Sequence, residues 1–97
     1  GRAELIYESP LLIEGSAATI KQYDKVRIAY NGTFKISIYF DDDRLVIEED
    51  IVPNEHGFFI IGIPNGDNSS HGIKFKVEGV GSMSAIQYSW KARERIT

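Results

Sequence analysis

The sequence contains no cysteine, and this absence excludes several kinds of chemistry at once. Without thiols the chain has no disulfide, no thiolate nucleophile and no thiolate metal ligand. Because secreted domains of this size often carry disulfides, the absence favours a protein that is made or assembled in the cytoplasm. No apolar run approaches the roughly 20 residues that a membrane helix needs, so no membrane partner is expected.

Strong charge and catalytic motifs are also lacking. The formal net charge of the 97 residues is only −3, which gives no electrostatic reason to expect nucleic-acid binding. The two histidines, His56 and His71, stand in no recognisable motif, and the sequence has no nucleophile elbow. The sequence therefore predicts a protein that is not an enzyme and has no cofactor.

The sequence has no stretch with helical spacing, and it is instead rich in the two-residue alternation of β-strands. The clearest example is 34–40, where apolar residues on one face alternate with Lys35, Ser37 and Tyr39 on the other. Asn31-Gly32 precedes it, a dipeptide that favours a type I′ hairpin turn. The acidic run 41–43 follows it, so we predict a hairpin on either side of this strand.

Further short strands are predicted along the whole chain. They cover 4–8, 11–14, 20–30 with a bulge near Asp24, 44–50, 58–63, 73–79 and 84–90, with a turn at Val80-Gly81-Ser82. Seven or eight such strands predict an all-β fold, an antiparallel β-sandwich of either immunoglobulin-like or jelly-roll topology. We expect a single domain over residues 1–97, with 91–97 as a charged tail or linker. Because the chain begins at Gly1 rather than methionine, we expect it to be part of a longer protein.

The apolar residues of two predicted strands indicate which of their side chains are buried. The segment 58–63, FFIIGI, is apolar on both faces, which predicts a strand that is buried on both sides or that faces a neighbouring chain. In the last strand Trp90 shares a face with Ile86 and Tyr88, which favours a place in the core for Trp90.

Three surface features are candidate ligand sites, each with a simpler explanation. The acidic turn 41–43, with the acidic residues 48–50, offers oxygens to calcium, although charge at a hairpin tip also prevents edge-to-edge aggregation and no EF-hand spacing is present. The polar loop 65–71 resembles loops that bind sugars, but any soluble connection has a similar composition. Tyr39 is the best exposed aromatic candidate for an interface or for stacking on a sugar. The candidate residues for a ligand or interface surface are Tyr39, Asn65, Asp67, Asn68 and His71.

The order of segments along the whole chain resembles a known group of domains. An opening strand pair (ELIYESPLLIE) leads into KVRIAYNGTFKISIYFDDDRLV, then FFIIGIP, a polar loop, and GIKFKVEGVGSMSAIQYSW. This order is similar to small β-sandwich domains in structural proteins of tailed bacteriophages, namely tail hub, DNA-stabilisation and baseplate- or fibre-associated proteins. The acidic turn departs from the glycine-containing turn that is usual in that group.

The resemblance implies a non-enzymatic virion component whose partners are other virion proteins. It implies a homo-oligomeric ring or larger assembly and a location in the virion, with assembly in the host cytoplasm. It carries no individual site residues, because such domains act through surfaces. The alternative is a carbohydrate-binding module or host-surface adhesin that binds a glycan through Tyr39 or the loop 65–71.

Overall fold

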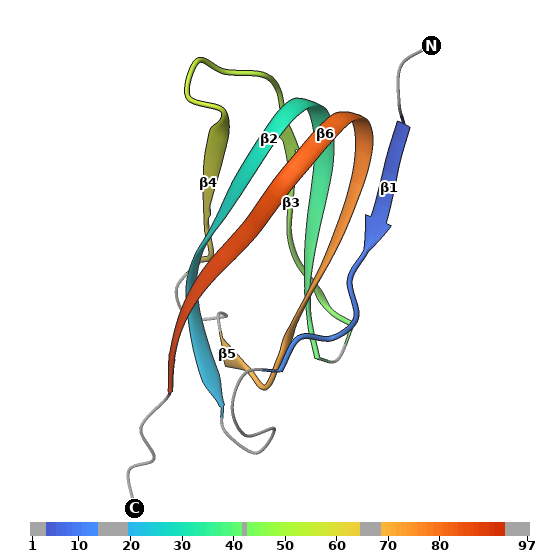
Figure 1. Ribbon diagram of the computed structural model, residues 1–97. Coiled ribbons are helices and arrows are strands. Elements are labelled where there is room, and N and C mark those ends of the chain that lie inside the picture. The colour runs from blue at the N-terminus through green and yellow to red at the C-terminus, as the bar shows by residue number, and fades with distance from the viewer. Residues whose placement is uncertain (1–3, 14–19, 42, 65–68, 93–97) are drawn as a thin grey trace, which may run out of the picture.

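The computed structural model describes residues 4–13, 20–41, 43–64 and 69–92, and there the protein is all β (Figure 1). Its six strands form one antiparallel sheet. They are β1 (Glu4–Glu8), β2 (Lys21–Phe40), β3 (Leu45–Ile51), β4 (Phe58–Gly62), β5 (Ser69–Ser70) and β6 (Ile73–Ala92). These described segments include no helix that could cross a membrane.

Two long strands, β2 and β6, form the framework of the sheet. They pair in antiparallel fashion over their whole length, from Lys21 opposite Ala92 to Phe40 opposite Ile73. β1 adds to the N-terminal half of β6, and β3 adds to the C-terminal half of β2. β4 and β5 both add to the N-terminal half of β2. Every other strand is therefore attached to one half of this central pair.

The turns that the sequence predicts at Asn31-Gly32 and at Val80–Ser82 are wrong. Both segments lie inside continuous strands, with Gly32 directly opposite Gly81. The φ angles of these two glycines are +137° and +134°, and a Cβ on Gly32 would lie 2.2 Å from the carbonyl oxygen of Val80. The glycines let two backbones bend together at close approach, and neither chain reverses there. Each predicted pair of strands is therefore one long strand, and the described part of the chain has six strands in place of the seven or eight that were predicted.

The bend folds the central strand pair back on itself, as the arch of β2 and β6 in Figure 1 shows. Tyr23 and Phe40, near opposite ends of β2, have ring centroids 5.6 Å apart. Phe75 and Tyr88, in opposite halves of β6, are 5.7 Å apart. We call the half with β4 and β5 the first layer, and the half with β1 and β3 the second layer. One continuous sheet therefore supplies both walls of the core.

The predicted alternation of apolar residues is confirmed in both halves of the central pair. The predicted bulge is also confirmed, because the register shifts between Tyr23 and Val26. The buried apolar residues come from the facing sides of the two layers. They are Tyr23, Val26, Ile28, Tyr30, Phe34, Ile36, Ile38, Phe40, Ile51, Ile61, Ile63, Ile73, Phe75 and Val77.

The structure decides several smaller predictions. The hairpin after Phe40 is confirmed, with β3 returning along β2 and Asp43 at a φ of +59°. β4 is not buried on both faces within this chain, because Ile60 is 49% exposed, and its contact with a neighbouring chain stays a prediction. Trp90 is not in the core either, since 37% of it is exposed. Of the predicted strand 11–14 the structure describes residues 11–13, where Leu12 makes an isolated bridge to Ile73.

Candidate functional site

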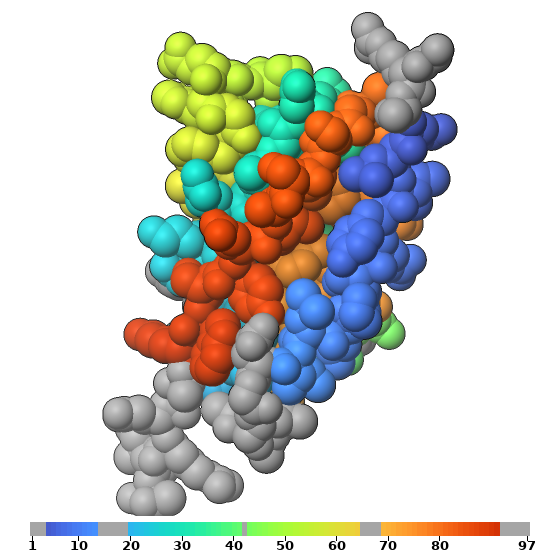
Figure 2. Space-filling view, in the orientation of Figure 1, coloured from blue at the N-terminus to red at the C-terminus, as the bar shows by residue number. Residues whose placement is uncertain are grey.

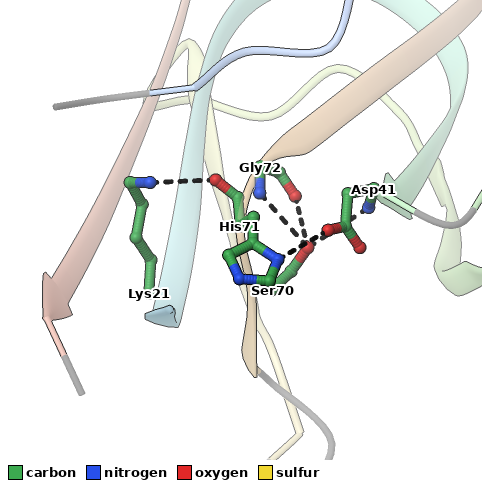
Figure 3. A network of polar contacts seen from close by, with 5 residues as sticks. All are labelled: Lys21, Asp41, Ser70, His71 and Gly72. Carbon is green, nitrogen blue, oxygen red and sulfur yellow. Dashed lines mark hydrogen bonds and ion pairs between the residues drawn. The ribbon is translucent and has the colours of Figure 1, made fainter. Parts of the chain in front are cut away.

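A cluster of polar contacts joins the end of β2 to the turn between β5 and β6 (Figure 3). The imidazole Nδ1 of His71 lies 3.0 Å from the Asp41 carboxylate. The ammonium of Lys21 donates to the carbonyl oxygen of His71 at 2.9 Å. Lys21 is fully buried, and its Nζ also lies 5.5 Å from the centre of the Trp90 ring. The cluster thus brings a predicted site residue, His71, together with an aspartate and a lysine distant in sequence.

The hydroxyl of Ser70 is fully engaged by backbone groups in this cluster. It donates to the Gly72 carbonyl oxygen at 2.7 Å and accepts from the Gly72 amide at 3.3 Å. It also accepts from the Asp41 amide at 3.2 Å. Because one hydroxyl has one proton and two lone pairs, these three contacts use its whole bonding capacity. Ser70 therefore closes the β5–β6 turn and ties it to the end of β2.

The carboxylate of Asp41 is stabilised in its charged form. Partial burial by itself would raise the pKa of Asp41, but the hydrogen bonds with His71 and Ser70, together with the electrostatic interaction with His71, outweigh that effect. The pKa of Asp41 therefore lies below 3.8, the ordinary value for an aspartate. The contact between Asp41 and His71 is strongest when the imidazole is protonated.

The cluster contains a serine, a histidine and an aspartate, but it does not have the geometry of a hydrolase triad. In a triad the serine hydroxyl gives its proton to the histidine. Here the Ser70 hydroxyl donates to the Gly72 carbonyl oxygen instead, and Ser70 is buried. The arrangement serves as a clasp between two strand ends.

The acidic turn does not gather carboxylates around one point. Asp41 faces His71, whereas Asp43 pairs with the ammonium of Lys74. Asp42 lies outside the described residues. Within the described part of the chain, no group of three or more acidic or histidine side chains could hold a metal ion.

The other predicted site residues are separate from the clasp or cannot be placed. Tyr39 is half-buried on the outer side of the second layer, where the Nζ of Lys74 lies 5.5 Å from the centre of its ring. Tyr39 thus already has a cation over its ring. Asn65, Asp67 and Asn68 lie outside the described residues.

An apolar groove of about 320 Å³ opens on the side of the molecule where β1 and the C-terminal half of β6 face each other. Figure 2 shows this side, with a hollow between β1 in blue and the end of β6 in red-orange. All the residues that line the groove are uncharged. They are Leu5, Tyr7, Leu12, Phe75, Met83, Ser84, Ala85, Ile86 and Tyr88.

Both rims of the groove are strand edges. Among the described strands, β1 pairs only with β6, and the C-terminal half of β6 pairs only with β2. Each rim thus presents backbone N–H and C=O groups with no ladder partner in the described residues. Sequence reasoning missed this groove, because alternation shows that Ile86 and Tyr88 share a face but not which strands become edges.

No family model, curated protein or solved structure matches this chain. Its function is therefore inferred from its own residues and contacts.

Proposed function

We propose that this chain is a non-enzymatic packing domain of a tailed-bacteriophage virion protein, in the tail or at the head-tail junction. It would be made in the host cytoplasm, and its partners would be neighbouring virion subunits. The order of segments along the sequence supports the phage assignment. The single observation that carries the packing role is the uncharged groove between two strand edges.

The composition of the exposed surface supports a packing role. Tyr7, which lines the groove, is 45% exposed, and two further apolar residues of the same segment that do not line it, Ile6 and Leu11, are 70% and 39% exposed. Single exposed apolar residues are ordinary, but several together beside an apolar groove are typical of protein contact surfaces. Partner binding would remove this surface from water, at roughly 25 cal/mol for each Å² of apolar area.

We also propose that the folded sheet is a variant of the predicted β-sandwich. The two layers pack face to face around one core, as in a sandwich. Here β2 and β6 each run through both layers, so the bend at the glycines replaces two of the usual loops. This continuity leaves β1 and the end of β6 as edges on the same side.

The contacts of Tyr39 do not favour the glycan-binding alternative. A sugar stacks on an open aromatic face, but Tyr39 is half-buried and lies beneath Lys74. Lys74 is held there by Asp43. A glycan array with the wild-type protein and the Tyr39→Ala variant tests this alternative directly. Saturable binding that the variant loses would replace the packing proposal.

The experiment for the proposed function uses particles of the phage whose genome encodes the chain. Mass spectrometry of purified particles should find the chain in a fixed ratio to the major structural proteins. Cross-linking of intact particles should then connect Lys91, at the end of β6, to another virion protein or to another copy. Absence of the chain from the particles would refute the virion assignment. Its presence with no cross-link from any lysine would refute the packing role.

A further inference from the structure

We propose that the outer face of the first layer holds a binding site for a phosphate monoester carried by a small polar molecule such as a sugar. The site is a pocket of about 240 Å³ whose lining includes Lys25 and Arg27 of β2 and Gln87 and Ser89 of β6. Apart from Tyr88, the pocket shares no lining residue with the apolar groove. Binding there goes beyond the proposed packing role and does not depend on it.

The alternation of β2 places two cations side by side on this face. Val26 and Ile28 are buried in the core, so Lys25 and Arg27 point to the outer side of the sheet, where both are exposed. Residues two apart on one strand have Cα atoms about 6–7 Å from each other. Arg27 also lies directly opposite Gln87 of β6. Both cations are therefore within reach of one bound phosphate group.

No carboxylate neutralises these two cations within the described part of the chain. Neither Lys25 nor Arg27 forms an ion pair there, and none of the residues that line the pocket is acidic, Asp24 included among those that do not line it. The outer face of the second layer differs, because there Lys35 pairs with Glu48 at 3.6 Å. Two positive charges without a counter-charge, in a protein whose net charge is −3, attract an anion to this pocket.

The guanidinium of Arg27 is held in position before any ligand binds. Its Cζ lies 4.4 Å from the centre of the Phe58 ring, and its Nη1 donates to Oε1 of Gln87 at 3.3 Å. A guanidinium has five N–H donors, so one such hydrogen bond leaves four for a ligand. Its planar fork can bind two oxygens of one phosphate, whereas the ammonium of Lys25 adds a point charge.

The charge and the walls of the pocket select the class of ligand. A phosphate monoester carries a charge of about −1.5 to −2 near pH 7, which matches the two cations, whereas a carboxylate or a phosphodiester carries only −1. The amide of Gln87 and the hydroxyl of Ser89 offer hydrogen bonds to further polar groups of the ligand. On the β4 side Ile60, which lies opposite Arg27 and is half-exposed, offers an apolar wall. A sugar ring has hydroxyl groups and C–H faces that suit these two walls.

Isothermal titration calorimetry of the full-length protein with glucose 6-phosphate tests the site. We expect saturable binding with a Kd of about 1 mM or below at low ionic strength, and weaker binding at about 0.5 M salt because salt screens exposed charges. Glucose should not bind in the same range. Inorganic phosphate should bind at least about threefold more weakly than glucose 6-phosphate, because it lacks the apolar contact with Ile60.

Two variants and a matched control assign the binding to this pocket. Arg27→Gln should weaken the binding of glucose 6-phosphate by at least about tenfold, because it removes charge-assisted hydrogen bonds. Lys25→Gln should weaken it by about threefold or more. Lys35→Gln should leave the affinity unchanged, since Lys35 is also exposed on β2 but lies on the second layer and pairs with Glu48. All three side chains are exposed, so the variants should fold, and thermal unfolding checks this.

A second measurement locates the ligand without any substitution. In NMR titrations with glucose 6-phosphate, the backbone amides of Ile60 and Gln87 should shift, whereas those of Leu5 in the groove and Lys35 on the second layer should not. Shifts confined to the groove or to the second layer would overturn the proposal.

Three further results would overturn the proposal. The first is no binding of glucose 6-phosphate up to about 10 mM, a concentration at which even weak association is visible. The second is an equal loss of affinity in Arg27→Gln and Lys35→Gln. The third is tighter binding of a hexathymidylate or a hexaglutamate peptide than of glucose 6-phosphate, which would replace the small phosphate monoester by a nucleic acid or an acidic protein segment.

Discussion

The carboxylate of Asp41 shows how one residue makes the stability of this protein depend on pH. The folded protein lowers the pKa of Asp41 below the unfolded value of 3.8, because His71 contacts the charged form. At pH values between the folded and the unfolded pKa of Asp41, the folded state therefore binds fewer protons than the unfolded state. The free energy of unfolding rises with pH in this range. The contribution of Asp41 to the free energy of unfolding is fully present at pH values above its unfolded pKa. It is lost as the pH falls through its folded pKa.

We predict that Asp41→Asn lowers the free energy of unfolding at about pH 6 and has a smaller effect at a second pH below the folded pKa of Asp41, where the wild-type carboxylate is also neutral. Urea unfolding at the two pH values measures the difference. His71→Gln should remove the same part of the pH dependence. An equal effect of Asp41→Asn at both values would show that the charge of Asp41 does not stabilise the clasp.

A second prediction at this scale concerns the hydroxyl of Ser70. Ser70→Ala leaves the Asp41 amide without the oxygen that it contacts at 3.2 Å, and such a loss costs about 1–3 kcal/mol. Ser69→Ala, at the neighbouring half-buried position, should cost less than about 0.5 kcal/mol. Chemical denaturation of the two variants gives both values. Equal decreases in the free energy of unfolding would mean that the hydrogen bonds of Ser70 do not stabilise the turn.

At the scale of elements, the bend in β2 and β6 depends on glycines that face each other. A Cβ on Gly81 would lie 2.1 Å from the carbonyl oxygen of Asn31 and 2.8 Å from the Cα of Gly32. No side chain fits at such distances, and both glycines have positive φ. The bend therefore requires glycine on both strands at the same level.

We predict that Gly32→Ala destabilises the protein by about 2 kcal/mol or more, from backbone strain and from steric overlap together. Gly62→Ala is the control, since a Cβ at Gly62 meets nothing within 4 Å and its φ is not positive. Thermal unfolding of the two variants makes the comparison. A Gly32→Ala variant as stable as Gly62→Ala would show that the bend tolerates a side chain.

At the scale of the whole molecule, the fold depends on pairings between residues that are far apart in sequence. β2 and β6 are separated by β3, β4 and β5, yet they pair from Phe40–Ile73 to Lys21–Ala92. Closing such large loops costs conformational entropy before the favourable contacts between the strands form. Topologies with non-local pairing fold slowly for this reason.

We therefore predict refolding on a timescale on the order of milliseconds to seconds, as for other all-β domains with non-local pairing. Stopped-flow fluorescence can follow it, because Trp90 is in β6. Gly32→Ala should slow refolding if the bend forms in the transition state, and should speed unfolding if it forms later. Refolding in microseconds would mean that local contacts dominate.

The candidate site was less predictable than the fold. His71 stood in a polar loop and was a reasonable candidate, but its partners Asp41 and Lys21 are 30 and 50 residues away and no local pattern connects them. The burial of Lys21 could not be foreseen, because lysine is rarely buried and its neighbours along the chain are unremarkable. Trp90 was assigned to the core from its shared face with Ile86, but it lies at the end of an edge strand and remains 37% exposed.

The sequence by itself determined the β class, the faces of the strands and the bulge after Tyr23, because alternation and the steric demands of residues act over a few positions. It also determined where the chain could bend, at Asn31-Gly32 and at Val80-Gly81-Ser82, without showing how. Only the tertiary structure decided that these two segments lie opposite each other and bend together within continuous strands. That outcome depends on long-range pairing, and the same pairing decided which strands became edges and where the groove opens. Local patterns carry no information about such partners, because whether a strand lies at an edge depends on which distant segments pair with it.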